Sequence, residues 1–132
     1  MKTTIRVLLV DDHAVVRSGL RLLVEREADL AVVGEADSGA EAVKQTLDLC
    51  PDVVVMDITL PDFDGVEATR RIRAACPEVH VLALTMHGED AYLRSFLQAG
   101  GLGYVRKSAA DRDVVTAIRM AARGESFLQT EG

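Results

Sequence analysis

The sequence has few aromatic residues and no excess of positive charge. It contains three phenylalanines, two tyrosines and no tryptophan, and 15 lysines and arginines stand against 21 aspartates and glutamates, a formal net charge of -6. Binding to nucleic acid depends on basic side chains that pair with phosphates and, for single strands, on aromatic side chains that stack with bases. We therefore expect these 132 residues not to bind nucleic acid by themselves.

Cysteines and long apolar runs are also scarce. Cys50 and Cys76 have a spacing that matches no zinc, redox or haem motif, so we expect two buried free thiols. No apolar run approaches the roughly 20 residues of a membrane span, and the first residues lack the pattern of a secretory signal peptide. These features predict a protein of the reducing cytoplasm that makes no contact with membranes.

Short β-branched runs alternate with longer amphipathic stretches along the whole chain. This alternation is typical of βαβ units that build a parallel sheet. Several of the runs are apolar throughout, as expected for strands that helices cover on both faces. The length fits one α/β domain. The predicted strands are 5–10, 31–36, 53–56, 79–84 and 103–105.

Between these runs, apolar residues recur at helical spacing. Ser38 is followed three residues later by Glu41, a pair that predicts the start of the second helix. The stretch 89–100 has an apolar arc too wide for one buried face, which leaves two explanations: deep packing against its neighbours, or a surface that docks a partner. The expected inward stripes of the first two helices are Val16, Leu20, Leu23 and Val24, and Ala40, Val43 and Leu47; the wide arc consists of Tyr92, Leu93, Phe96, Leu97 and Ala99.

Charged and hydroxyl side chains stand where several predicted strands end. Asp11 and Asp12 follow the first strand and Asp57 follows the third. Thr85 comes at the end of the fourth strand and Lys107 after the fifth. In open α/β sheets, ligands bind outside the carboxyl ends of the strands. We therefore expect these five side chains to converge on one edge of the sheet.

Three clustered carboxylates repel one another unless they share a cation. Oxygen ligands at few positions suit Mg²⁺, and with this charge neutralised a carboxylate can attack phosphorus and form an aspartyl-phosphate. Asp57, alone at its strand end, is the predicted nucleophile. Each residue alone also has a simpler explanation, such as a helix cap for Asp11 or Asp12, a turn, or a solvated charge. The five residues taken together favour formation of an aspartyl-phosphate over these simpler explanations.

Four strings in the sequence resemble the receiver domain of two-component response regulators: VLLVDDH, VVVMDITLPDFDGVEATRRIR, VLALTMH and GYVRK. They occur in the order of the family and cover essentially the whole chain, and they are most similar to receivers of the NarL/FixJ type. The resemblance implies a flavodoxin-like, doubly wound α/β fold, with five helices around a five-stranded parallel sheet of order 2-1-3-4-5.

The resemblance also implies a role for the residues at the strand ends. Asp57 would accept a phosphoryl group from the phosphohistidine of a sensor histidine kinase. Thr85 and Lys107 would hold phosphoryl oxygens. Tyr104 would be the switch aromatic, which turns inward when Thr85 moves.

Further residues are implied as metal ligands or as modulators of lifetime. Mg²⁺ would be held by Asp12 and Asp57, by Asp11 directly or through water, and by the main-chain carbonyl of Thr59. Thr59 and His87 would flank the path of the hydrolytic water and so tune the lifetime of the phosphoryl group.

Three positions depart from common patterns of the family. Met86, larger than the alanine or glycine of many receivers, follows the switch hydroxyl and is expected to narrow access to the phosphoryl group. Asp62 replaces a frequent glycine in a turn. Ser108 follows Lys107 in place of a common proline, and the sequence leaves the isomer of that peptide bond open.

The chain is expected to be a signalling switch and not a turnover enzyme. Residues 1–124 would form the receiver domain, and 125–132 would begin a linker to a helix-turn-helix output domain absent from this chain. Phosphorylation would promote a homodimer through the fourth and fifth helices or the first and fifth, and DNA would be bound through the output domain alone. There are two alternatives. The first is a receiver fold used only for protein contacts. The second is a Mg²⁺-dependent phosphatase with an aspartyl nucleophile, which the sequence DDHAV after the first strand disfavours.

Overall fold

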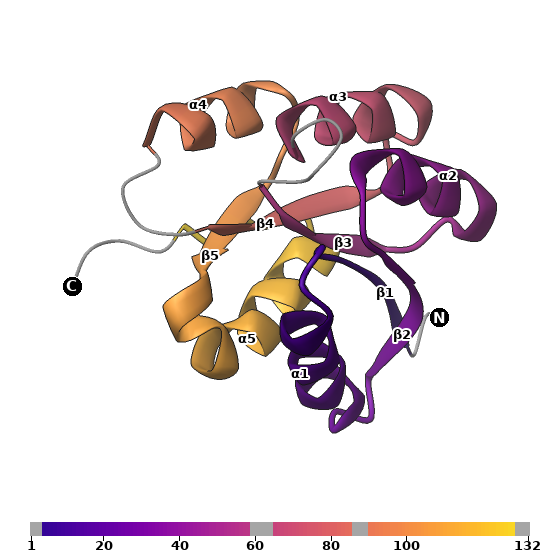
Figure 1. Ribbon diagram of the computed structural model, residues 1–132, viewed down its shortest axis with the longest axis vertical. Coiled ribbons are helices and arrows are strands. Elements are labelled where there is room, and N and C mark those ends of the chain that lie inside the picture. Colours follow the sequence, from indigo (N-terminus) through magenta and orange to yellow (C-terminus); the bar gives the residue numbers. More distant parts are fainter. Residues whose placement is uncertain (1–3, 59–64, 86–89, 129–132) are drawn as a thin grey trace.

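Five parallel strands form one sheet in the computed structural model, which describes residues 4–58, 65–85 and 90–128 (Figure 1). Neighbouring strands follow the order β2-β1-β3-β4-β5, which confirms the predicted flavodoxin-like topology. Every predicted strand is present, with its ends shifted by no more than one residue. The strands are β1 (Ile5–Val10), β2 (Leu30–Ala36), β3 (Val53–Asp57), β4 (His80–Thr85) and β5 (Gly103–Arg106).

Helices cover both faces of the sheet. α1 and α5 lie on one face, and α2, α3 and α4 lie on the other (Figure 1). A short 3-10 helix, Lys107–Ala109, connects β5 to α5. Within the described part of the chain, no helix combines the length and the apolar character needed to cross a lipid bilayer. The helices are α1 (Ala14–Glu25), α2 (Gly39–Leu49), α3 (Gly65–Ala75), α4 (Asp90–Gln98) and α5 (Ala110–Ala122).

The central strands are buried on both faces. Leu9 and Val55 pack in the layer of α1 and α5, whereas Leu8 and Val54 pack in the layer of α2, α3 and α4. Each fully buried Val or Leu contributes about 1.5–3 kcal/mol relative to an exposed one. The two-sided cover explains why these strands read as continuous apolar runs.

The two ends of α2 are set by Ser38 and Cys50. The Ser38 hydroxyl accepts a hydrogen bond from the Glu41 backbone N–H at 3.2 Å, as the spacing predicts. Cys50 caps the other end in a left-handed conformation, with a φ of 48°. The prediction that Cys50 is buried is wrong, because this cap lies outside the packed face of the helix and its side chain is exposed. Cys76 is buried as predicted, and burial raises the pKa of its thiol.

Three side chains predicted to face the core are exposed instead: Val16 by 38%, Leu47 by 52%, and Ala40. Val16 lies in the first turn of α1, ahead of Leu20, where the buried residues of that helix begin. In α2 the fully buried residues are Gly39, Ala42 and Thr46, and Val43 packs half-buried beside them as predicted. The Thr46 hydroxyl donates to the Ala42 carbonyl within the helix, so the polar Thr46 is buried while its neighbour Leu47 is exposed.

The wide apolar arc of α4 is divided between core and surface. Phe96 is buried and Leu93 is half-buried, whereas Tyr92 and Leu97 are exposed by 41% and 38%. Gly101 leaves room for the Phe96 ring, since a Cβ at that glycine would lie 2.3 Å from it. Deep packing is therefore the wrong explanation for Tyr92 and Leu97.

Candidate functional site

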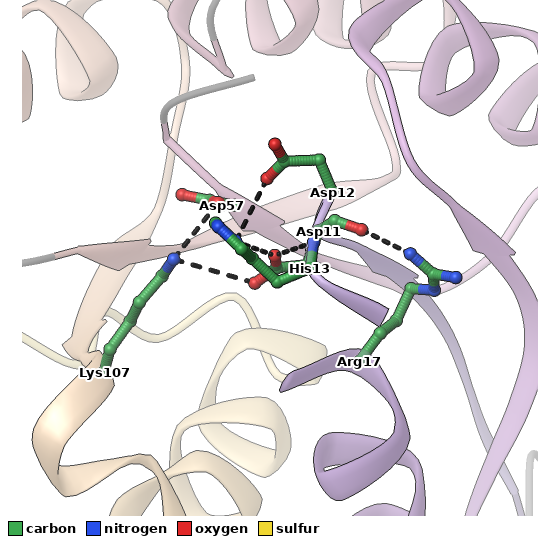
Figure 2. Close-up of polar contacts among 6 residues, drawn as sticks. All are labelled: Asp11, Asp12, His13, Arg17, Asp57 and Lys107. Carbon is green, nitrogen blue, oxygen red and sulfur yellow. Dashed lines mark hydrogen bonds and ion pairs between the residues drawn. The ribbon is translucent and has the colours of Figure 1, made fainter. Parts of the chain in front are cut away.

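The carboxyl edge of the sheet brings four of the predicted site residues together. Asp11 follows β1, Asp12 comes next, Asp57 ends β3, and Lys107 follows β5 (Figure 2). β1 and β3 are neighbours in the sheet, so Asp11 and Asp57 stand side by side. Carboxylate oxygens of the three aspartates lie within 4.8 Å of one another.

Lys107 bridges two buried carboxylates from the opposite side of the site. Its Nζ lies 3.1 Å from Oδ2 of Asp57 and 3.7 Å from Oδ2 of Asp11. The Asp57 side chain is 2% exposed and that of Asp11 is fully buried. The lysine therefore neutralises part of a negative charge that would otherwise be costly to bury.

Asp11 is held rigidly but not completely satisfied. Its Oδ1 accepts a hydrogen bond from the His13 backbone N–H at 2.8 Å. The N-cap position of α1 is His13, so the explanation of Asp11 or Asp12 as the cap of this helix is wrong. Oδ2 of Asp11 is buried and accepts no hydrogen bond from the described residues. A buried polar atom without such a bond costs about 1–3 kcal/mol, which a bound cation would offset.

Arg17 ties the acidic site to the outer strand β2. Its Nη1 donates to the Asp11 main-chain carbonyl at 2.6 Å, and its Nε donates to Oε1 of Glu35 at 2.9 Å. Burial tends to raise the pKa of Glu35, but hydrogen bonds from Arg21 and Arg17 outweigh it and hold that pKa below its ordinary value. Glu35 therefore remains ionised and keeps Arg17 in place.

His13 belongs to the same cluster, although it is not among the residues predicted from the sequence. Its Nδ1 lies 3.1 Å from Oδ1 of Asp11 and 3.2 Å from Oδ1 of Asp12 (Figure 2). The imidazole is largely exposed, at the rim of the site. The signal available in the sequence was its place directly after two aspartates, at the point where a strand gives way to a helix.

The donor set fits a divalent cation. Three carboxylates supply hard oxygen ligands at short mutual distances, and Asp11 offers a buried oxygen that no described hydrogen bond satisfies. Mg²⁺ prefers oxygen ligands and is usually held by one or two carboxylates together with waters. Lys107 supplies the remaining positive charge from the side of β5.

Thr85 and Tyr104 lie on the strands that flank this cluster. Thr85 is the last residue of β4 and is 2% exposed; the residue before it, Leu84, is in register with Asp57. Tyr104 lies on β5, in register with Ala83, and packs half-buried against the layer of α2, α3 and α4. In the register of the sheet, Thr85 therefore lies one position beyond the level of Asp57, and Tyr104 lies one position before it.

Four residues of the sequence analysis, Thr59, Asp62, Met86 and His87, lie outside the described residues, so their proposed roles stay predictions. The Lys107–Ser108 peptide bond, whose isomer the sequence left open, is trans.

Comparison with known proteins gives the family of the chain. Residues 7–119 match the response regulator receiver domain. The chain belongs to this family. Receiver domains are signalling proteins that typically bind Mg²⁺ at an acidic pocket, and the three aspartates described above form such a pocket in this receiver.

Three relatives illustrate the similarity. The receiver is 38% identical over 127 residues to the transcriptional regulatory protein LiaR of Bacillus subtilis, across 96% of this chain and 60% of LiaR. A two-component response regulator of the LuxR family from Aurantimonas is 42% identical, with a TM-score of 0.88, over 94% of this chain and 89% of that one. The signal receiver domain of NarL from Mycobacterium tuberculosis is 31% identical, with a TM-score of 0.88, over 92% and 98%. These similarities confirm the predicted fold and the resemblance to NarL-type receivers. The chain spans only three fifths of the length of LiaR.

Proposed function

We propose that this receiver is a phosphorylation switch in which Asp57 accepts a phosphoryl group from the phosphohistidine of a sensor histidine kinase. The observation that carries the proposal is the environment of the Asp57 carboxylate. It is nearly buried, 3.1 Å from the Lys107 ammonium, and within 4.8 Å of ligand atoms of Asp11, Asp12 and His13. A carboxylate so surrounded has its charge balanced and its geometry fixed before the donor arrives.

The transfer exchanges one bond to phosphorus for another. A carboxylate oxygen of Asp57 attacks the phosphorus of the donor phosphohistidine and forms the new O–P bond. The P–N bond to the kinase imidazole breaks, and its electron pair stays on that nitrogen. Lys107 then donates to a phosphoryl oxygen in place of its present contact with Asp57.

Asp11, Asp12, Asp57 and the main-chain carbonyl of Thr59 would hold Mg²⁺. When bound, the ion supplies the positive charge that lets two anions, carboxylate and phosphoryl group, approach each other. Arg17 fixes the main chain at Asp11 through a bond of 2.6 Å, so this ligand is oriented in advance.

Conversion of the phosphoryl group into a signal would depend on Thr85 and Tyr104. Thr85 lies at the buried end of β4, next to the register partner of Asp57, where its hydroxyl can follow a phosphoryl oxygen. Tyr104, on the neighbouring strand, would turn inward as Thr85 moves. Thr59 and His87 would tune the rate of hydrolysis. In this proposal the chain assists its own phosphorylation and is not a turnover enzyme.

The switch would act through homodimerisation and an output domain. Residues 1–124 would be the receiver and 125–132 the start of a linker, in line with a chain that covers 60% of a transcriptional regulatory protein. Phosphorylation would pair two receivers through α1 and α5 or through α4 and α5, and so bring two helix-turn-helix domains to DNA half-sites. We also propose a cytoplasmic location, because a transcriptional regulator acts where the chromosome lies.

Intact mass measurement after incubation with Mg²⁺ and acetyl phosphate tests the assignment. We expect one phosphoryl adduct on the wild type, none on Asp57→Asn, and none in the presence of a chelator. Asp48→Ala, which removes an exposed carboxylate on α2, is the matched control and should form the adduct normally.

An adduct of equal yield on Asp57→Asn would refute the choice of acceptor. No adduct on the wild type with any small phosphoryl donor or a cognate kinase would favour the fold as a module for protein contacts. Continuous release of phosphate from phosphoesters would favour the phosphatase.

A further inference from the structure

The outer edge of β5 is covered by the residues that follow α5. The Tyr104 backbone N–H donates to the Phe127 carbonyl at 2.8 Å, and Tyr104 and Leu128 form a parallel β-bridge. In Figure 1 the last described residues lie beside β5. We call residues 125–128 the C-terminal strap.

The strap is fitted to the strand at close range. A Cβ at Gly103 would lie 2.5 Å from the Phe127 carbonyl oxygen and 2.8 Å from its nitrogen, closer than any side chain allows. The half-buried Phe127 packs against the core layer of α1 and α5. The strap starts from Gly124, whose φ of 77° turns the chain back after α5.

The strand that holds the strap also reaches the phosphoryl site. The main chain of Tyr104 is hydrogen-bonded to the strap, while the Tyr104 side chain packs against the layer of α2, α3 and α4. Three residues later, Lys107 contacts Asp57 at 3.1 Å. A shift of β5 toward the site therefore acts on the strap through a very short stretch of chain.

We propose that the β5 edge is an intramolecular docking surface for the strap, and that a phosphoryl group on Asp57 releases it. The trigger rests on the proposed function. The added phosphoryl oxygens draw Lys107 away from its present carboxylate partners and Thr85 along β4, so β5 moves and Tyr104 turns. The Tyr104 N–H then no longer meets the Phe127 carbonyl. The strap leaves the edge readily because Leu128 is already 49% exposed.

Hydrogen exchange of the Tyr104 amide, measured by NMR, tests the docking. Gly103→Ala should push the strap from the edge and speed exchange, whereas Gly19→Ala, where a Cβ meets nothing within 4 Å, should leave it unchanged. Phe127→Ala removes the packed side chain without altering β5 and should speed exchange as well. If the Tyr104 amide exchanges at the same rate in the wild type, in Gly103→Ala and in Phe127→Ala, docking of the strap on β5 is refuted.

The trigger is tested by the same amide with and without Mg²⁺ and beryllofluoride, a phosphoryl mimic. In the wild type the mimic should speed Tyr104 exchange about fivefold or more, the lower end of ordinary coupling between two sites. Because coupling is reciprocal, Gly103→Ala should bind beryllofluoride more tightly by the same factor.

The possible failures are distinguishable. If the mimic shifts the resonances of Asp57 and Thr85 but leaves Tyr104 exchange unchanged, release of the strap is refuted while the phosphoryl site stands. If the mimic shifts neither site residue, the proposed function is refuted and the trigger with it. The comparison of Gly103→Ala with Gly19→Ala would then still decide whether the strap docks on β5.

Discussion

The Nζ of Lys107 lies 3.1 Å from Oδ2 of Asp57, although the two residues are 50 positions apart in the sequence. The contact joins the end of β3 to the residue after β5, across the intervening strand β4. It holds the Asp57 carboxylate and the Lys107 ammonium in one ion pair. Two changes, to Lys107 and to Asp12, separate the roles of charge balance and metal binding at this edge.

Replacing Lys107 by alanine should lower the stability of the metal-free chain. The change leaves the buried Asp57 and Asp11 carboxylates without their ammonium partner, at a cost of about 1–3 kcal/mol. Mg²⁺ should restore most of this loss and should still bind, since the lysine is not a ligand. Denaturant unfolding with and without Mg²⁺ measures both effects. Stability that is unchanged in the metal-free variant would contradict the ion pair.

Replacing Asp12 by alanine should have the opposite effects on Mg²⁺ binding and on the stability of the metal-free chain. The loss of a rim carboxylate should weaken Mg²⁺ binding by roughly tenfold or more. The metal-free chain should keep or gain stability, because repulsion among the three carboxylates falls. Calorimetric titration with Mg²⁺ is the measurement, with Asp48→Ala as control. Unchanged affinity for Mg²⁺ would remove Asp12 from the ligand set.

Stability should depend on pH through His80, on β4. Burial, and next the positive charge of Arg73, lower the pKa of His80 below its ordinary value of 6.5. As the pH falls, the unfolded chain therefore takes up this proton first. The contribution of neutral His80 is fully present above about pH 6.5 and is lost as the pH falls through its folded pKa.

Melting temperature measured across this range checks the His80 prediction. The decline toward acid pH should be smaller in His80→Gln than in the wild type, and Arg73→Gln should raise the pKa of His80 in an NMR titration. An equal decline in the wild type and in His80→Gln would assign the pH dependence to other groups.

Phosphorylation should increase self-association through α1. Val15 and Leu22, one face of that helix, are exposed by 85% and 69%, more than Tyr92 and Leu97 on α4. Sedimentation velocity with beryllofluoride should show a dimer for the wild type and for Tyr92→Ser, but a monomer for Val15→Glu. A dimer that survives Val15→Glu and is lost in Tyr92→Ser would move the interface to α4 and α5.

The sequence predicts the sheet well because its signals are local. Strands buried on both faces read as apolar runs, and Ser38 and Glu41 mark a helix start within four residues. Helix faces are harder to predict. The predicted stripe of α2 includes Val43, which packs in the core, but it misses the fully buried Gly39, Ala42 and Thr46, which are small or polar.

The site is only partly predictable for a related reason. Parallel strands place their following residues at one edge, so Asp11, Asp57 and Lys107 could be expected to meet. The position of His13 against two carboxylates, and the close approach of Phe127 to Gly103, depend on the path of the backbone outside the regular elements. No periodicity in the sequence records that path.

Arg17 contacts both Asp11 and Glu35, so the outer strand β2 is linked to the main chain of the acidic cluster. Glu35 lies on a different strand from the residues proposed to react, yet a change there alters the hold on the main chain beneath Asp11. In the proposed switch, substitutions at Glu35 are therefore expected to change the lifetime of the phosphoryl group while the reacting groups stay the same.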